Sequence, residues 1–498
     1  MGTARLGGRN WAVLSSLGLL IPTLAAIVRL AHPGLPLGPD LVAWEAGNKL
    51  IARRNLIWSI ATMHVAFSIW YLWSVMVLFM PQARYGFTTG DKLLVGATAA
   101  LVGALVRIPY AMGTARLGGR NWAVLSSLVL LIPTLAAIVL LAHPGLPLWP
   151  YLVCAALTGL GGGNYAAALA NVESFFPQRR KGFALGLTGG VGNLGAAGIQ
   201  AVGLVVLATA GNQAPYWVCA VYLVLLALVG AGAALFMDNL DHSVEVGHVR
   251  SVLTVPDTWT ISFLYMCASG SFIGFAFAFG QVIAHNLIAG GQTHGQAALH
   301  AAEIAFAGPL LGSMARVVGG KLGDRFDGGR VTLTVLAAMI VAGGFLVAVS
   351  THDDLTRPSG APVSLYTTAG YIAGFIALFI CCGVGKGSVF KLIPSVFAQR
   401  SRALELGDTE RRHWERARSA ALIGFAGSFG ALGGVVINLA LRQSYASTGS
   451  STPAFGAFML CYVAAAALTW ARYVRPRRAP EPRTAPDWQP MAEQPVSS

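Results

Sequence analysis

The chain has 498 residues, a net charge of +14 and a mean hydropathy of +0.63, with 55% hydrophobic and 11% charged residues. A soluble domain carries roughly 25% charged residues, so the composition excludes a set of soluble domains. Apolar stretches of about 20 residues recur along the chain, and each is long enough to cross a bilayer as a helix. The basic residues lie in short loops between these stretches, which argues against a nucleic-acid-binding surface and indicates a lipid bilayer as the surroundings.

The chain begins with a near-duplicate of a later segment. Residues 1–42 differ from residues 112–153 at only four positions, and both copies start with MGTARLGGRNWAVLSS. Such close agreement indicates either a recent partial duplication or an artificial addition to the chain. An apolar span precedes the second copy but not the first. We therefore expect the second copy to belong to the main bundle and the first to form an extra hydrophobic helix outside it.

Apolar length predicts twelve membrane-spanning helices besides this extra helix. The predicted spans are 56–80, 92–112, 121–142, 149–175, 183–208, 215–237, 258–285, 304–320, 331–350, 364–398, 419–441 and 455–474. The loops between them alternate between basic and non-basic, and Lys and Arg mark the cytoplasmic side. Both ends of the twelve-span unit are therefore predicted to be cytoplasmic.

This pattern divides the chain into four parts after residue 42. We expect a six-helix bundle over 43–237, a central cytoplasmic loop over 238–257 and a second six-helix bundle over 258–474. The tail over 475–498 is rich in proline and polar residues, so we expect it to be disordered and cytoplasmic.

The two halves of the twelve-span unit resemble each other. RIPYAMGTARLGGR (107–120) and RVVGGKLGDRFDGGR (316–330) each place an arginine late in a span, before a basic turn that ends in Gly-Gly-Arg. GGVGNLG (189–195) and GSFGALG (427–433) share glycines at three positions. A six-plus-six repeat with a site between the halves is typical of transporters.

Several of these segments resemble a known family. GGKLGDRFDGGRVTL resembles the loop signature of the major facilitator superfamily, and GLGGGNYAAALANVESFFPQRRKGFALGLTGGVGNLG is similar to the fifth-span signature of the NarK-type nitrate/nitrite porters. GKGSVFKLIPSVF and ARSAALIGFAGSFGALGG resemble the matching segments of the second half. The resemblance covers about residues 43–474. It implies an all-α major facilitator fold, in a multi-pass protein of the bacterial inner membrane.

Arg107 and Arg316 are the main candidate binding residues. An arginine inside a span costs several kcal/mol, about 2.5–3.5 on the mildest scale, and usually marks a pathway or a paired charge. The alternative is that both side chains reach the cytoplasmic surface. Their matched positions in the two halves favour binding, because a guanidinium offers two parallel donors to a planar oxyanion. The resemblance implies that both arginines hold the anion.

No carboxylate lies deep inside a predicted span. Glu173 lies near the cytoplasmic end of its span and Glu303 at the start of another. The deep charges are instead Arg107, Arg316 and Lys386. This pattern predicts an anionic substrate. Lys386 is either a third cation that strengthens anion binding or a lysine that burial keeps neutral.

Two glycine stripes, GGVGNLG (189–195) and GSFGALG (427–433), belong to the candidate site. Three polar residues, Thr188, Asn193 and Tyr265, complete it. Glycines let helices approach closely, and packing is the alternative to a binding role for most of them, Gly192 and Gly430 included. Thr188 and Asn193 add donors on the fifth span. The resemblance implies that Thr188 and Tyr265 contact the anion; the alternative for Tyr265 is an interfacial aromatic. His64 fits a hydrogen-bonded core residue better than a proton relay.

The sequence thus predicts a nitrate/nitrite transporter that works by alternating access, with no enzymatic activity and no bound cofactor or metal. One monovalent anion would halve the charge of the two arginines, so the loaded carrier should reorient faster, which favours antiport. The alternatives are proton-coupled nitrate uptake and a non-transporting nitrate sensor or membrane scaffold. We expect no nucleic-acid partner and a monomeric functional unit.

Overall fold

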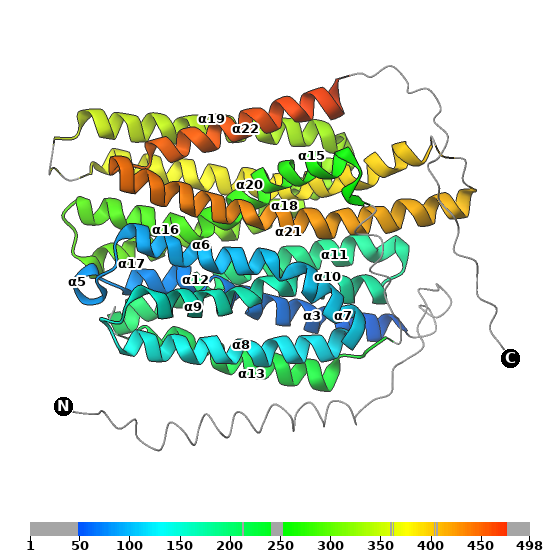
Figure 1. Cartoon of the computed structure of the whole chain (residues 1–498), viewed down its shortest axis with the longest axis horizontal. Helices are drawn as coiled ribbons and strands as arrows, with labels where there is room; N and C mark the ends of the chain where they lie inside the picture. The colour runs from blue at the N-terminus through cyan, green and yellow to red at the C-terminus, as the bar shows by residue number, and fades with distance from the viewer. Residues whose placement is uncertain are drawn as a thin grey trace.

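The computed structural model describes residues 48–475, except 212–213, 241–251, 359–360, 362, 403 and 405–406. The regular elements of this part are helices that run roughly along one direction (Figure 1). Ten of them are long and apolar enough to cross a membrane, or up to twelve if two bent pairs each count as one span. The predicted all-α polytopic membrane fold is confirmed. The predicted extra helix in 1–42 and the tail beyond Arg475 lie outside the described residues.

Each half of the chain contributes its own set of helices. The first half contains α3 (Lys49–Trp70), α4 (Leu72–Met76), α5 (Gln82–Tyr85), α6 (Thr89–Leu105), α7 (Arg107–Leu117), α8 (Gly119–Ala142), α9 (Leu148–Gly159), α10 (Asn164–Phe175), α11 (Gln178–Asn193), α12 (Gly195–Ala210) and α13 (Tyr216–Phe236). The second half contains α15 (Pro256–Tyr265), α16 (Ser271–Ala289), α17 (His294–Ala305), α18 (Ala307–Phe326), α19 (Gly328–Thr356), α20 (Leu365–Ser401), α21 (Asp408–Thr448) and α22 (Thr452–Thr469). The first set fills the lower part of Figure 1 and the second the upper part.

Several spans are interrupted near their middle. The helix pair α3 and α4 bends by 44°, and α6 and α7 bend by 41° where Arg107 begins the second helix. A π turn over Met266–Gly270 joins α15 to α16. Irregular backbone at membrane depth is tolerated where protein surrounds it, and each break includes a buried residue: Tyr71, Arg107 and Gly270.

The predicted start of the eighth span is wrong, and one further helix extends well beyond its predicted span. The eighth span was predicted to begin at residue 304, but α17 begins at His294. A capping box starts this helix, because Thr293 and Gln296 exchange hydrogen bonds between side chain and backbone. The eleventh span was predicted to begin at 419, close to the apolar stretch that starts at Ala421, but the helix that contains it, α21, begins earlier, at Asp408. Apolar length underestimates both helices because polar residues continue a helix beyond the hydrocarbon region.

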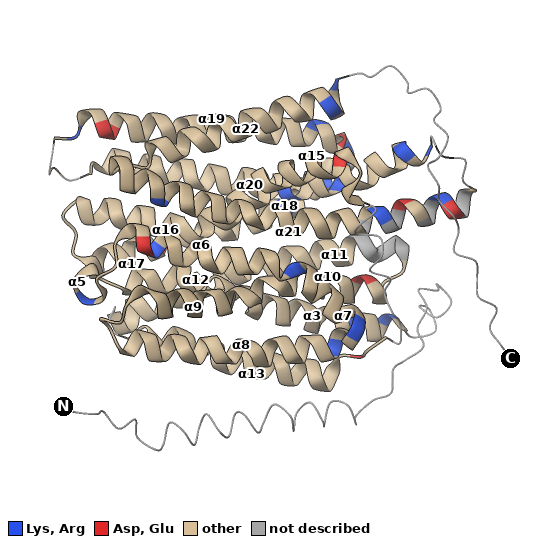
Figure 2. Ribbon diagram, viewed as in Figure 1, with Lys and Arg blue, Asp and Glu red and all other residues tan. Residues whose placement is uncertain are grey.

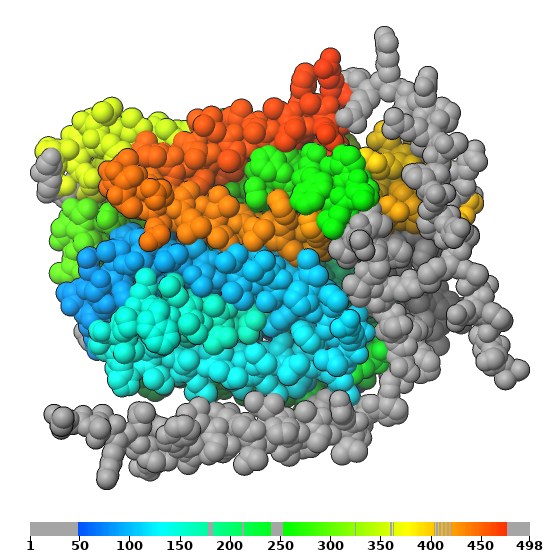
Figure 3. All heavy atoms as spheres, viewed as in Figure 1, coloured from blue at the N-terminus to red at the C-terminus, as the bar shows by residue number. Residues whose placement is uncertain are grey.

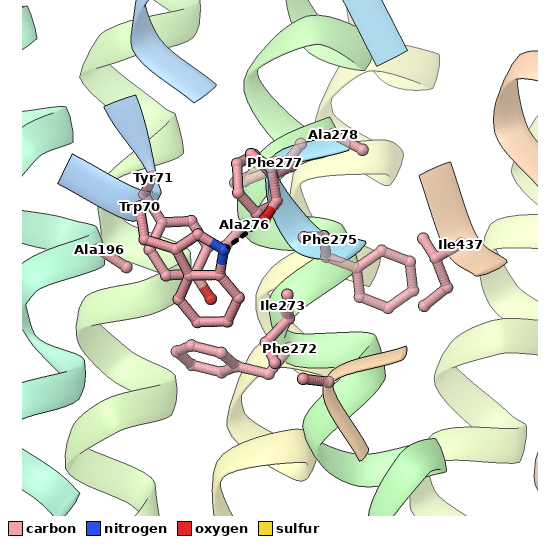
Figure 4. Close-up of a cluster of buried hydrophobic side chains, with 14 of the residues drawn as sticks. Trp70, Tyr71, Ala196, Phe272, Ile273, Phe275, Ala276, Phe277, Ala278 and Ile437 are labelled. Carbon is pink, nitrogen blue, oxygen red and sulfur yellow. Dashed lines mark hydrogen bonds between the residues drawn. The ribbon is translucent and has the colours of Figure 1, made fainter. Parts of the chain in front are cut away.

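The two halves meet along a continuous interface. Helices α6 and α21 lie side by side along it, as Figure 3 shows. Toward the end with few basic residues, hydrogen bonds join the halves: Gln200 Nε2 donates to the Ala276 carbonyl at 2.9 Å, and His294 Nε2 lies 3.0 Å from the Leu78 carbonyl oxygen. Aromatic residues add to this contact, since the rings of Tyr71 and Phe277 have centroids 4.7 Å apart (Figure 4).

Within the second half, α18 and α20 approach each other through glycines. A methyl group at Gly383 would lie 2.0 Å from the Gly312 carbonyl oxygen and 3.0 Å from Ala315 Cβ. Only a residue without Cβ allows this separation, as is common for helices packed inside membranes. The position of α18, and therefore of Arg316, depends on this contact.

We predict that Gly383→Ala lowers stability by about 1–3 kcal/mol, the usual cost of overpacking, because the backbone of α18 must move. Gly456→Ala is the matched control, since a methyl group at Gly456 would meet no atom within 4 Å. The measurement is the thermal melting temperature of each purified variant in detergent. Equal melting temperatures for the two variants would contradict the close approach of α18 and α20.

Candidate functional site

Three cationic side chains are buried in the middle of the bundle. Figure 2 shows that most charged residues lie toward the two ends of the helices. Arg107 of α7, Arg316 of α18 and Lys386 of α20 are exceptions, with exposed fractions of 3%, 8% and 3%. The two arginine side chains therefore lie inside the protein and not on its surface.

Each arginine donates hydrogen bonds to the opposite half of the chain. Arg107, from the first half, donates Nη1 to the carbonyl of Gly427 in α21. Arg316, from the second half, donates Nη1 to the carbonyl of Gly189 in α11 at 3.4 Å. Its Nη2 donates to the hydroxyl of Tyr165 in α10 at 2.8 Å. The arginines thus join the two halves at the level of the site.

The glycines that accept these bonds are the first members of the two predicted stripes. Gly189 and Gly427 occupy equivalent positions in GGVGNLG and GSFGALG, so the arrangement repeats with the halves exchanged. A methyl group at Gly189 would lie 2.9 Å from Arg316 Nη2. A side chain at this position would therefore displace the guanidinium.

Aromatic rings surround both guanidinium groups. The Tyr165 ring centroid lies 4.9 Å from Arg107 Cζ and 5.7 Å from Arg316 Cζ. The Trp70 ring lies 5.4 Å from Arg107 Cζ, and the Phe390 ring lies 5.4 Å from Arg316 Cζ. Cation–π contacts of this kind contribute about 0.5–2 kcal/mol each. They offset part of the cost of burying the two charges.

Lys386 brings a third charge to the same region. Its Nζ lies 3.9 Å from the centroid of the Phe272 ring. The charges of Arg107 and Arg316 both act on it, and those two arginines also repel each other. Lys386 therefore adds to the positive potential of the site whenever it is protonated.

No carboxylate among the described residues forms an ion pair with these three cations. The acidic residues that do form ion pairs lie near the helix ends: Asp238 bonds Arg54 Nη2 at 2.7 Å, and Asp257 bonds Arg400 Nε at 2.8 Å. Within the same part of the chain, no three His, Cys, Asp or Glu side chains converge as metal ligands. The arrangement is therefore suited to hold a small anion.

Tyr265 and Gly430 lie beside the arginines. Tyr265 is buried, and its ring stacks on Phe390 with centroids 4.6 Å apart. Its hydroxyl lies within the electrostatic reach of both Arg107 and Arg316. Gly430 packs against Tyr265, because a methyl group there would lie 2.5 Å from the ring atom Cδ1. Gly430 thus sets the position of Tyr265.

Thr188, Gly192 and Asn193, the predicted site residues of the fifth span, lie on α11 and differ from one another in their contacts. Thr188 is buried and its hydroxyl donates to the Ala184 carbonyl of its own helix at 2.8 Å. The amide nitrogen of Asn193 is buried without a hydrogen-bond partner among the described residues. Gly192 packs against Met63, where a methyl group would lie 2.5 Å from Cε. His64 contacts the Val191 carbonyl at 3.2 Å, as expected for a core histidine.

Sequence reasoning missed three aromatic residues of the site, Tyr165, Trp70 and Phe390. Tyr165 lies inside the quoted segment GLGGGNYAAALANVES, but an aromatic residue in an apolar span can face lipid, the core or the pathway. The only signal was its position directly after a glycine run and Asn164. That signal does not distinguish these three environments.

Comparison with known proteins identifies the family of this chain. Residues 58–437 match the Major Facilitator Superfamily model. The chain is 32% identical over 460 residues to the nitrate/nitrite transporter NarU of Escherichia coli, covering 87% of this chain and 94% of that protein. The chain belongs to the NarK-type nitrate/nitrite porter family of the major facilitator superfamily.

Two further matches support the family and the fold. A probable nitrate/nitrite antiporter of Thermus thermophilus, NarK2, is 27% identical over 446 residues, covering 85% of this chain and 93% of that protein. A crystal structure of a variant of the nucleoside transporter NupG matches with a TM-score of 0.58 at 11% identity, over 84% of this chain and 100% of that chain. At that identity the likeness concerns the fold alone.

We predict that Gly430→Ala weakens the binding of a small oxyanion by about tenfold or more, the effect of losing one charged hydrogen bond. The added methyl group must push Tyr265 away from its place beside the arginines. Gly424→Ala, on the same helix with no atom within 4 Å of the added methyl group, is the control. Calorimetric titration measures both affinities, and equal values would place Tyr265 outside the anion site.

Proposed function

We propose that this protein transports nitrate and nitrite across the bacterial inner membrane by alternating access between its two halves. The observation that carries the proposal is the pair of buried arginines, one from each half, which lack a carboxylate partner among the described residues. The family relationship and the names of the relatives NarU and NarK2 support the choice of substrate. Transport, rather than sensing or catalysis, is the activity that fits a site between two halves.

A planar monovalent anion suits the donors of the site. Arg107 and Arg316 each present a planar guanidinium, and two parallel N–H groups match two oxygens of nitrate or nitrite. In this proposal Tyr265 and the unpartnered amide of Asn193 add donors, and Lys386 adds charge. Thr188, Gly192 and Gly430 shape the neighbouring helices.

Antiport of nitrate and nitrite is supported by how the arginines are held. Their bonds to Gly427, Gly189 and Tyr165 cross between the halves, so reorientation must break them. A bound anion competes for the same donors and also lowers the positive charge that must move through an apolar barrier. The carrier with a bound anion should therefore reorient faster than the empty carrier. Inward movement of nitrate is then coupled to outward movement of nitrite.

The basic ends of the helices face the cytoplasm in this proposal. Lys and Arg residues in short loops are retained on that side. Arg54 and Arg400, which pair with Asp238 and Asp257, lie at this end. The hydrogen bond between His294 and the Leu78 carbonyl then lies on the periplasmic side, and Arg475 leads into a cytoplasmic tail.

We predict that Arg107→Lys and Arg316→Lys each reduce nitrate counterflow by about 100-fold or more. An ammonium does not reproduce the two parallel donors of a guanidinium, and a charged hydrogen-bond pair is worth roughly 3 kcal/mol. Arg54→Lys, at an exposed helix end, is the control and should transport normally. Proteoliposomes containing equal amounts of each variant provide the measurement. Normal counterflow in either site variant would remove that arginine from the anion site.

We also predict that uptake of labelled nitrate requires nitrate or nitrite inside the vesicles. The reason is the slow return of the carrier without an anion. The measurement compares vesicles loaded with nitrite and vesicles loaded with gluconate, with and without an inward proton gradient. Accumulation driven by the proton gradient alone in gluconate vesicles would replace antiport with proton-coupled uptake.

A further inference from the structure

Tyr165 occupies a central place between the two arginines. It lies on α10 in the first half, is 4% exposed, and its ring faces both guanidinium groups. Its hydroxyl accepts the hydrogen bond from Arg316 Nη2 at 2.8 Å, across the interface between the halves. Ring and hydroxyl therefore make separate contributions. The ring contacts both guanidinium groups, whereas the hydroxyl, within the described part of the chain, accepts a hydrogen bond only from Arg316 of the opposite half.

The hydroxyl differs from the other acceptors of the arginines. Among the described residues, Arg107 and Arg316 otherwise donate to the backbone carbonyls of Gly427 and Gly189, which no substitution removes. The bond from Arg316 to Gly189 measures 3.4 Å, so the 2.8 Å bond to Tyr165 is its shorter link with the first half. Hydrogen bonds with a charged donor are shorter and stronger than neutral ones. Tyr165 thus supplies the main side-chain link between the halves at the site.

We propose that the Tyr165 hydroxyl is a positioning group that holds Arg316 across the pathway when no anion engages it, and so enforces obligatory exchange. The bond must break before α18 can move away from α10. An anion that takes over the Nη2 donor releases α18 from Tyr165. This inference rests on the proposed nitrate/nitrite exchange and deepens it by naming the residue that suppresses return without cargo.

The test replaces the hydroxyl and keeps the ring. Tyr165→Phe removes one oxygen atom and leaves the aromatic faces beside both arginines. Tyr110→Phe is the matched control, because Tyr110 is a tyrosine of the same half that packs against Trp122 and Gly163 of that half. Tyr165→Leu removes hydroxyl and ring together and provides a second variant. Melting temperatures establish that each variant is folded.

Two fluxes are measured in proteoliposomes for each variant. Exchange is the uptake of labelled nitrate into vesicles loaded with nitrite. Net flux is the uptake into vesicles that contain gluconate as the only anion, with potassium and valinomycin to compensate charge. Nitrate affinity in detergent is measured alongside. The ratio of net flux to exchange reports how often the carrier returns without an anion.

We expect the ratio of net flux to exchange to rise about tenfold in Tyr165→Phe, the factor that corresponds to one charged hydrogen bond. Nitrate affinity should stay the same or increase, since an internal competitor for Arg316 is lost. Tyr165→Leu should raise the ratio in the same direction, and Tyr110→Phe should match the wild type. An unchanged ratio in Tyr165→Phe would overturn the proposal and leave the ring as the functional part.

A parallel loss of affinity and exchange in Tyr165→Phe would also overturn it, because the hydroxyl would then be a ligand of the anion. The wild-type arm tests the proposed function separately. If wild-type net flux equals exchange, or if neither nitrate flux is detectable, antiport or nitrate transport itself fails and the role of Tyr165 fails with it. The variants decide the role of Tyr165 only when the wild type exchanges.

Discussion

The burial of two guanidinium groups between the halves is the constraint on which the rest of the structure depends. Arg107 and Arg316 lie where a charge costs several kcal/mol unless it is solvated by the protein. Each half provides a backbone carbonyl, that of Gly427 or Gly189, to the arginine of the other, and the ring of Tyr165 contacts both arginines. The halves must therefore meet at this level.

Glycine makes it geometrically possible for each arginine to donate to a carbonyl of the opposite half. A guanidinium reaches a helix carbonyl only where the neighbouring side chains leave room, and Gly189 leaves that room for Arg316. The same residue type brings α18 against α20 at Gly383 and α21 against Tyr265 at Gly430. Close helix packing and exposure of backbone to the site thus have one physical cause.

In the described part of the chain, charges at the ends of the bundle are neutralised by ion pairs, whereas those at its centre are not. At the ends, Asp238 and Asp257 neutralise nearby arginines and tie helices of the same half together. At the centre, the described residues offer the cations aromatic faces and carbonyl dipoles but no carboxylate. Dipoles stabilise the charges without cancelling them. A net positive potential therefore remains for an anion, while the pairs at the ends hold each half together.

The sequence by itself determined the helical membrane fold, the two arginines, their matched glycine turns and the family. Hydrophobic length and the positions of Arg107 and Arg316 carry that information, because burying a charge leaves few alternative roles. The start of α17 at His294 was missed, since polar residues extend a helix beyond its apolar part. The role of Tyr165 and the crossing of each arginine to the other half were decided only by the tertiary structure. An aromatic residue fits lipid, core and pathway equally well, and only the packing of distant helices selects its neighbours.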